Sequence, residues 1–223
     1  LAEETGCISD LSYSLIKRAC LDAREWPAHL TLAINIAPQQ FMDVWLSERI
    51  LAILVETGFP PHRLEVEITE SALVQDLEVT RKTLTSLQNL GVRIALDDFG
   101  TGYSSLYHLR ELKFDKLKID RSYVESMRLS SERAKLVDAI IALGSSLGLL
   151  TTAEGIESGT SVDWLAGQGC TYGQGYLFGR PMDKATTDGL LTQWSDDAGR
   201  IVRTWPAPAA KPTNLAFDPS GRL

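Results

Sequence analysis

The chain of 223 residues is long enough for one large domain or two small ones, and its hydrophobic content of 44% is ordinary for a protein with a buried core. Its 22 basic and 29 acidic residues give a formal net charge of −7, which argues against broad binding to a nucleic-acid polymer. The three cysteines form no CxxC pair, so neither a disulfide framework nor a zinc site is expected. Free thiols indicate a reducing compartment, so we expect a cytoplasmic location. Because no apolar run of about 18 residues occurs, we expect a soluble segment without direct membrane contact.

Six short apolar runs, mostly separated by helical patterns, predict six buried strands. In chain order they lie within LTLAINIA, ETGFPPHRLEVEIT, NLGVRIALDDF, FDKLKID, SLGLLTTAEG and GQGCTYGQG. Four runs follow a glycine at the position expected for the end of a helix, namely Gly58, Gly91, Gly148 and Gly169. Runs rich in Val, Ile and Leu are typical of strands that are covered on both faces. Their alternation with helices predicts a parallel sheet, either doubly wound or closed as a barrel.

Each predicted strand has a polar side chain at its carboxyl end. These residues are Asn35, Glu67, Asp97 with Asp98, Lys118 with Asp120, Glu154 and Gln174. A doubly wound sheet would concentrate such groups near one switch point, whereas a barrel gathers them from every strand on one face. The pattern therefore favours a TIM-like (α/β)8 barrel. Six strands are fewer than eight, so we expect the others to lie before Leu1 or to be too irregular to recognise.

The carboxylates at these strand ends predict a metal site. Glu67, Asp97, Asp98 and Glu154 cannot all stay ionised in one pocket without a compensating charge. Oxygen ligands, including the carbonyl of Asn35, are those that Mg²⁺ or Mn²⁺ prefers. Two adjacent aspartates and two further carboxylates could hold two ions about 4 Å apart, an arrangement that activates water against a phosphodiester. The simpler alternative, that each acidic residue is a solvated strand end or a helix cap, is disfavoured because several strands share the pattern.

Lys118 has two interpretations. At the end of its own strand it could contact the attacking water or a phosphoryl oxygen. Alternatively, it could form a Schiff base in a barrel lyase or aldolase, although so many nearby carboxylates would keep its amine protonated. The glycines of the GTG sequence after Asp98 form either a simple turn or a mobile lid.

The motifs resemble those of the EAL domains, bacterial phosphodiesterases of the second messenger cyclic di-GMP. The matching segments, in the family's order, are LAEETG, NIAPQQF, LEVEITES, ALDDFGTGYSSL, LKIDRSYV, AEGIES and GQGYLFGRPM. They extend from Leu1 to about Trp194, and their combination is highly specific. The resemblance implies a TIM-like barrel that takes Mg²⁺ or Mn²⁺, as two ions, and opens cyclic di-GMP to linear pGpG.

The resemblance also implies a ligand set. Asn35, Glu67 and Asp97 correspond to ligands of a first metal ion. Asp97 would bridge to a second ion, which Asp98 and Glu154 would also hold. The implied catalytic residues are Asp97, Asp98, Glu154 and Lys118.

Further positions correspond to residues around the metal ions. Lys118 is similar to the lysine that contacts the nucleophilic water, with Asp120 beside it. Glu157 and Gln174 match positions that either contact the metal ligands without binding the metal or face the substrate. Glu70 matches the glutamate that anchors a flexible loop, which in this chain is DFGTGYSS.

The sequence departs from the family pattern in two places. The family carries its Glu-Ala-Leu signature upstream of LAEETG, so we expect the first strand and the signature to be missing from this chain, although catalysis requires them. Ala37 stands where the family commonly has serine, and we expect this to tune binding. We expect the barrel to span residues 1–195 and a Pro/Ala-rich tail to span residues 196–223.

The resemblance leaves a non-catalytic cyclic di-GMP receptor as the alternative to a hydrolase. Receptors that have lost catalysis are expected to lose metal ligands, and the ligands within this chain are intact. We further expect that this chain is the cytoplasmic portion of a larger bacterial protein with sensory or cyclase domains, and that it could form a homodimer.

Overall fold

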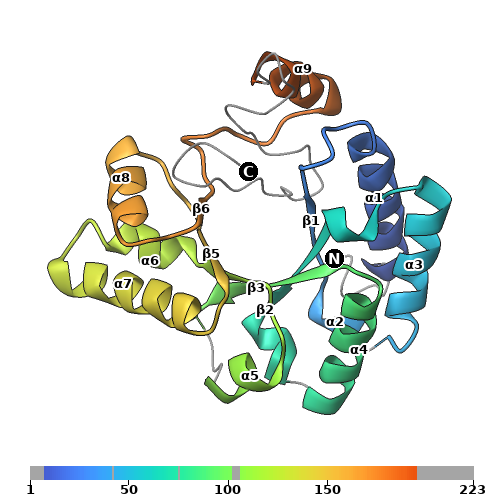
Figure 1. Cartoon of the computed structure of the whole chain (residues 1–223), viewed down its shortest axis with the longest axis horizontal. Helices are drawn as coiled ribbons and strands as arrows, with labels where there is room; N and C mark the ends of the chain where they lie inside the picture. The colour runs from blue at the N-terminus through green and yellow to red at the C-terminus, as the bar shows by residue number, and fades with distance from the viewer. Residues whose placement is uncertain (1–7, 42, 75, 102–105, 195–223) are drawn as a thin grey trace.

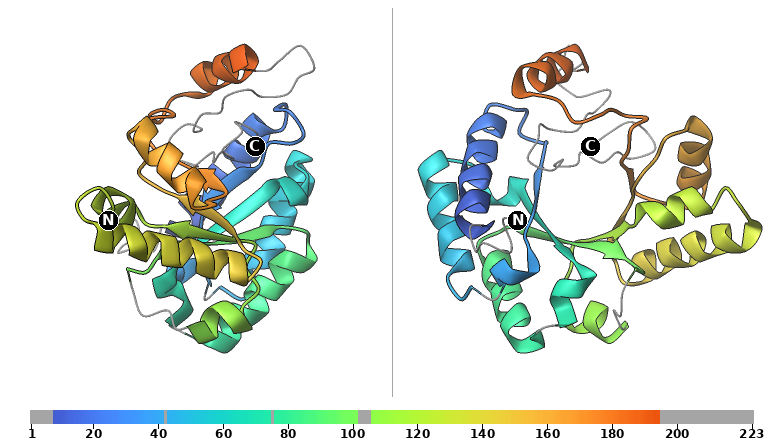
Figure 2. Two further views of the ribbon diagram at one scale, coloured as in Figure 1. Left: turned by 60° about the vertical axis from the view of Figure 1, so that its left-hand side comes forward. Right: turned by 180° about the vertical axis from the view of Figure 1, so that it is seen from behind.

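Six parallel strands form one curled sheet in the structure, a computed structural model that describes residues 8–41, 43–74, 76–101 and 106–194 (Figure 1). The strands are β1 (Leu32–Asn35), β2 (Leu64–Thr69), β3 (Arg93–Phe99), β4 (Lys116–Ile119), β5 (Leu150–Ala153) and β6 (Tyr172–Gly173). They pair in chain order from β1 to β6. The curl places β1 and β6 on opposite sides of a half-barrel (Figure 2). The predicted TIM-like α/β architecture is confirmed, with six strands in the described part of the chain.

Helices surround the outer face of the curled sheet (Figures 1 and 2). They are α1 (Ile8–Ala23), α2 (Pro38–Phe41), α3 (Leu46–Thr57), α4 (Leu77–Asn89), α5 (Leu106–Glu111), α6 (Arg121–Ser126), α7 (Ser131–Ser146), α8 (Gly159–Gly167) and α9 (Lys184–Trp194), with two 3₁₀ turns, η1 (Pro61–Arg63) and η2 (Glu70–Val74). Polar side chains fix several helix starts. For example, Asp76 accepts hydrogen bonds from the N–H groups of Glu78 and Val79 at the start of α4.

The four predicted glycines lie just after helices α3, α4, α7 and α8. Their φ angles are all positive: Gly58 66°, Gly91 89°, Gly148 72° and Gly169 83°. Glycine adopts this left-handed conformation without steric cost, which allows the chain to leave the helix and turn toward the next strand. The sequence pattern of helix, glycine and strand is therefore confirmed at all four positions.

Side chains alternate between the two faces of β2. Leu64, Val66 and Ile68 are completely buried on one face. Glu65 and Glu67, which are also buried, lie on the opposite face because successive side chains of a strand point in opposite directions. One face of the strand thus supplies the apolar core and the other supplies carboxylates.

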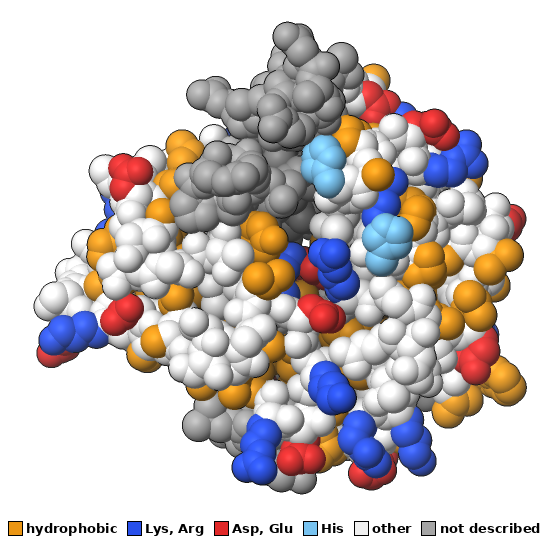
Figure 3. Space-filling view, viewed as in Figure 1, with side chains coloured by type: hydrophobic (Ala, Val, Ile, Leu, Met, Phe, Trp, Pro, Cys, Tyr) orange, Lys and Arg blue, Asp and Glu red, His pale blue; other side chains and the backbone are white. Residues whose placement is uncertain are grey.

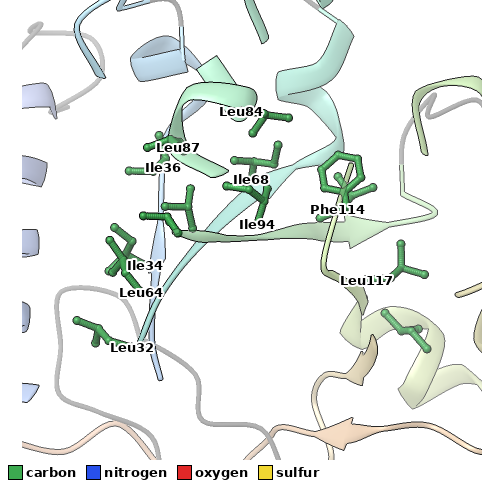
Figure 4. Packing of buried hydrophobic residues seen from close by; sticks show 14 of the residues in the cluster. Leu32, Ile34, Ile36, Leu64, Ile68, Leu84, Leu87, Ile94, Phe114 and Leu117 are labelled. Carbon is green, nitrogen blue, oxygen red and sulfur yellow. The ribbon is translucent and has the colours of Figure 1, made fainter. Parts of the chain in front are cut away.

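The apolar core lies between the outer face of the sheet and the helices. In Figure 4, Ile68 of β2 and Ile94 of β3 lie against Leu84 and Leu87 of α4. These four side chains are at most 2% exposed. Because the outer face carries this packing, the inner face of the half-barrel is left for polar side chains.

Charges of both signs are interspersed on the molecular face shown in Figure 3. Hydrophobic side chains also reach the surface, among them Leu51 and Val55 of α3, which are 40% and 73% exposed. None of the helices in the described part of the chain is both long and apolar enough to span a membrane.

Candidate active site

Lys118 lies at the centre of a cluster of carboxylates on the inner face of the half-barrel. Its Nζ atom lies 2.9 Å from Glu67 Oε2, 3.0 Å from Asp97 Oδ1 and 2.7 Å from Glu154 Oε1. Glu67, Asp97 and Lys118 belong to β2, β3 and β4, and Glu154 follows β5. Lys118 is 1% exposed and Glu67 2% exposed, so their ion pair is shielded from water. The structure thus brings four predicted site residues together.

The irregular end of β3 brings two adjacent aspartates to the same site. In a regular strand, Asp97 and Asp98 would point to opposite faces of the sheet. The pairing of β3 with β4 shifts register between Leu96 and Phe99, and Asp98 has a φ of 55°. This left-handed conformation is uncommon outside glycine, but aspartate adopts it more readily than most residues. As a result, carboxylate oxygens of Asp97, Asp98 and Glu154 lie within 4.8 Å of one another.

The donor atoms of this cluster fit a divalent cation. Asp97, Asp98 and Glu154 are the one group of three or more His, Cys, Asp or Glu side chains, among the described residues, whose donor atoms gather closely enough to hold a metal ion. All three donors are carboxylate oxygens, which Mg²⁺ and Mn²⁺ prefer, whereas zinc is more often bound by histidine and cysteine. Asp98 and Glu154 are also partly exposed, so an ion has access to them.

Burial and charge shift the pKa values within the cluster. Burial raises the pKa of Glu67 from its ordinary 4.5 to about 7, although the neighbouring ammonium of Lys118 opposes this shift. Burial likewise raises the pKa of Glu154 against the same opposing charge. For Lys118, burial alone would lower the pKa, but Glu67, Glu154 and Asp97 together hold it well above its ordinary value. The lysine is therefore protonated, which argues against the Schiff-base alternative because an imine forms from the neutral amine.

Asn35 and Gln174 border the cluster from the strands on either side. Asn35, the last residue of β1, is exposed and lies in register with Glu67. The N–H of Gln174 donates to the carbonyl of Ala153 at 2.8 Å, which places Gln174 beside Glu154. The buried Oε1 atom of Gln174 has no hydrogen-bond partner among the described residues. A donor group on a bound ligand would satisfy that oxygen.

Asp120 and Glu157 make local contacts and do not pair with Lys118 in the described structure. The carboxylate of Asp120 caps α6 by accepting a hydrogen bond from the N–H of Ser122 at 3.0 Å. Glu157 is exposed and pairs with Arg121, whose Nη2 lies 3.1 Å from Glu157 Oε1. Arg121 was not singled out in the sequence, because a lone arginine after a strand carries no pattern of its own.

Glu70 contacts the segment that follows Asp98. The residue begins η2 and is 2% exposed, and its Oε2 atom accepts a hydrogen bond from the N–H of Gly100 at 2.9 Å. Of the predicted loop DFGTGYSS, residues 98–101 are described, and residues 102–105 lie outside the described part. Glu70 therefore contacts the predicted loop through the N–H of Gly100.

A second buried ion pair lies on β2 and β4, two residues before Glu67 and Lys118. Nζ of Lys116 on β4 lies 2.7 Å from Oε1 of Glu65 on β2, and 5.0 Å from the centroid of the Tyr172 ring on β6. The pair was not predicted from the sequence, because neither residue lies at the carboxyl end of its strand, where the polar pattern occurs. The spacing of two residues in LEVE and in KLK was the available signal, since it places Glu65 with Glu67 and Lys116 with Lys118 on one face.

The sequence profile of the EAL domain family matches residues 1–181 of the chain. The chain belongs to the EAL domain family. Among curated sequences, the bifunctional diguanylate cyclase/cyclic di-GMP phosphodiesterase MucR of Pseudomonas aeruginosa is 38% identical over 186 residues, which cover 82% of this chain and 27% of MucR. This EAL domain spans about a quarter of the length of the first curated relatives it matches, at 24%, 25% and 28%.

Solved EAL structures share the fold of this domain. PaMucR phosphodiesterase in a c-di-GMP complex has a TM-score of 0.78 and 37% identity, with 81% of this chain and 75% of that chain covered. The EAL domain of Mycobacterium smegmatis DcpA has a TM-score of 0.78 and 38% identity, with 83% and 85% covered. A manganese/cy-diGMP complex of Klebsiella pneumoniae BlrP1 has a TM-score of 0.68 and 29% identity, with 75% and 44% covered.

Proposed function

We propose that this EAL domain hydrolyses cyclic di-GMP to linear pGpG at the carboxylate cluster around Lys118. The observation that carries the proposal is the set of ion pairs between Lys118 and Glu67, Asp97 and Glu154, with Asp98 beside them. MucR is named as a cyclic di-GMP phosphodiesterase, and PaMucR was solved in a c-di-GMP complex, which supports the same ligand for this chain.

The proposed cofactor is Mg²⁺ or Mn²⁺, as two ions. Asn35, Glu67, Asp97, Asp98 and Glu154 would hold them, and the donor chemistry of the cluster supports this choice. When bound, such ions lower the pKa of water and stabilise the attacking and leaving oxygens of a phosphodiester. The BlrP1 structure with manganese and cy-diGMP supports a divalent ion in this family.

The chain's own side chains have distinct roles in this proposal. Lys118, kept protonated by its carboxylate partners, offers N–H donors and a positive charge to the water or to a phosphoryl oxygen. Because its Nζ atom is shared among three carboxylates, it also keeps Glu67, Asp97 and Glu154 in one orientation. Gln174 would offer its buried amide oxygen to a donor on the substrate.

A purely receptor function is not favoured. Loss of turnover in a binding domain would be expected to coincide with loss of carboxylates from the cluster. Glu67, Asp97 and Glu154 are nevertheless present and pair with Lys118, and Asp98 lies beside Asp97 and Glu154. We further propose that the full-length protein carries the Glu-Ala-Leu glutamate upstream of this segment and that the barrel spans residues 1–195. The predicted tail, residues 196–223, lies outside the described part of the chain. MucR is named as bifunctional, which supports an additional cyclase domain in the full-length protein. Sensory domains, a homodimer and a cytoplasmic location are further parts of the proposal.

The proposal is tested by incubating the full-length protein with cyclic di-GMP and either Mg²⁺ or Mn²⁺ and separating the nucleotides by chromatography. We expect the conversion of cyclic di-GMP into pGpG, and no conversion in the presence of EDTA. Binding of cyclic di-GMP without any product would favour the receptor alternative instead.

A further inference from the structure

Two side chains hold opposite sides of Gly100. Glu70 Oε2 accepts the N–H of Gly100 at 2.9 Å, and the hydroxyl of Tyr123 donates to the carbonyl oxygen of Gly100 at 2.5 Å. Glu70 begins η2 and Tyr123 belongs to α6, so the two contacts come from separate elements. Gly100 is thereby fixed between two parts of the barrel wall.

Gly100 lies within a tight turn in which Thr101, the next residue, is hydrogen-bonded back to Asp98. The N–H and the Oγ1 of Thr101 both donate to the carbonyl oxygen of Asp98, at 3.2 Å and 2.8 Å. The N–H of Asp98 donates to Oδ1 of Asp97 at 3.0 Å. The φ of 55° at Asp98 is unfavourable for a residue with a side chain, and such a conformation persists only where surrounding contacts enforce it.

The ring of Tyr123 lies directly against the backbone of Gly100. A Cβ atom added at Gly100 would lie 2.8 Å from the Tyr123 hydroxyl oxygen and 2.9 Å from its Cε2 and Cζ atoms. Gly100 also has a φ of 95°, which a side chain rarely tolerates. The close approach that the hydroxyl needs for its hydrogen bond is therefore possible because residue 100 is a glycine.

We propose that Tyr123 is a positioning residue for the cation site. Its hydroxyl fixes the carbonyl of Gly100, which in turn holds Asp98 in the left-handed conformation that directs its carboxylate toward Asp97 and Glu154. Tyr123 acts through the backbone and does not contact the ion or the substrate. The consequence for turnover rests on the proposed function, whereas the consequence for cation binding can be measured without it.

The test compares two variants that each lose one hydroxyl. Tyr123→Phe removes the donor to Gly100 and keeps the ring, and Tyr13→Phe is the matched control, because the Tyr13 hydroxyl donates to Asp43 Oδ2 at 3.4 Å on the α1 side of the molecule. The full-length protein is titrated with Mn²⁺ without any nucleotide, and free Mn²⁺ is followed by electron paramagnetic resonance. We expect Tyr123→Phe to weaken Mn²⁺ binding about three- to tenfold, the usual effect of one hydrogen bond, and Tyr13→Phe to leave it within about twofold of the wild type.

A double-mutant cycle with Glu70→Leu, which removes the oxygen that accepts the Gly100 N–H, sharpens the test. Because Glu70 and Tyr123 act on the same residue, Gly100, their effects on Mn²⁺ affinity should be non-additive. Additive effects would mean that the two side chains act independently, which contradicts the proposal.

Three outcomes separate this inference from the proposed function. Unchanged Mn²⁺ affinity in Tyr123→Phe, including a case where only the unfolding temperature falls, overturns the positioning role even if the wild type hydrolyses cyclic di-GMP. Weakened Mn²⁺ binding in Tyr123→Phe supports that role even if the wild type produces no pGpG. A wild-type protein that binds no Mn²⁺ overturns both.

Discussion

Lys118 Nζ lies 2.7 Å from Glu154 Oε1, and the two residues come from neighbouring parallel strands at the point where each strand ends. The same ammonium group lies within 3.0 Å of oxygens of Glu67 and Asp97. Removal of one partner from a buried ion pair leaves an uncompensated charge and is strongly destabilising. Single substitutions in this cluster should therefore change activity, cation binding and stability, and different substitutions should change different ones of these properties.

Asp97→Asn removes a charge that both Lys118 and the proposed cations require. We expect turnover of cyclic di-GMP by the full-length protein to fall about 100-fold or more, because metal ligands and their supporting groups have effects of this size. The measurement is the initial rate with saturating Mn²⁺. Asp163→Asn is the control, since Asp163 is exposed on α8 and its loss should leave the rate unchanged. Activity retained in Asp97→Asn would contradict the assignment of Asp97.

Lys118→Ala should lower kcat far more than KM. The lysine is expected to act on the water or on a phosphoryl oxygen during the reaction, so its loss affects the transition state more than the bound substrate. Steady-state kinetics with cyclic di-GMP check this prediction. A changed KM with an unchanged kcat would remove Lys118 from the chemistry.

The same variant predicts an unusual response of stability to cations. Without Lys118, three carboxylates lie together with no ammonium group, so a bound divalent ion compensates more charge than in the wild type. We expect Mn²⁺ to raise the unfolding temperature of Lys118→Ala by more than that of the wild type. Equal shifts in differential scanning fluorimetry would argue that cations bind elsewhere.

Glu67 predicts a pH dependence of stability in the presence of EDTA. Its pKa is raised from 4.5 to about 7, chiefly by burial, so the folded state binds a proton that the unfolded state releases between these values. Its contribution is fully present below about pH 4.5 and is lost as the pH rises through about 7. Relative to Glu67→Gln, the free energy of unfolding of the wild type should therefore fall across this window. A constant difference between the two proteins over the window, measured by urea denaturation, would contradict the shifted pKa.

The buried ion pair between Lys116 and Glu65 predicts that a second substitution can restore the stability lost through the first. Lys116→Met leaves Glu65 buried without its partner, which should lower the free energy of unfolding by about 3 to 5 kcal/mol. In Glu65→Leu combined with Lys116→Met both charges are absent, and most of the stability should return. Urea denaturation of the single and double variants measures this. A double variant as unstable as Lys116→Met alone would show that the loss comes from packing.

The sequence predicted the six strands because each has a strong local signal, an apolar run bounded by a glycine or a polar residue. The convergence of Glu67, Asp97 and Glu154 followed from parallel strand order, which brings carboxyl ends to one face. The strands could be predicted from a few neighbouring residues, and the convergence of the carboxylates could be predicted from one general rule of topology.

Other features of the site depend on contacts that sequence patterns do not encode. The left-handed conformation of Asp98 coincides with a shift in strand register, and it lies two residues before Gly100, whose N–H and carbonyl groups bind Glu70 and Tyr123 from distant parts of the chain. The simultaneous contact of Lys118 with three carboxylates requires the registers of β2, β3, β4 and β5 together. For Asp120, the local role as a helix cap could have been expected from its place before α6.

The most direct test of the central claim is product analysis after incubation of the full-length protein with cyclic di-GMP and Mn²⁺ in water enriched in ¹⁸O. Attack by water on one phosphodiester predicts linear pGpG that carries one ¹⁸O atom on its terminal phosphate, and the rate of its formation should fall about 100-fold or more in Asp97→Asn. Recovery of unchanged cyclic di-GMP from an enzyme that binds it, or a product without ¹⁸O, would contradict hydrolysis at this site.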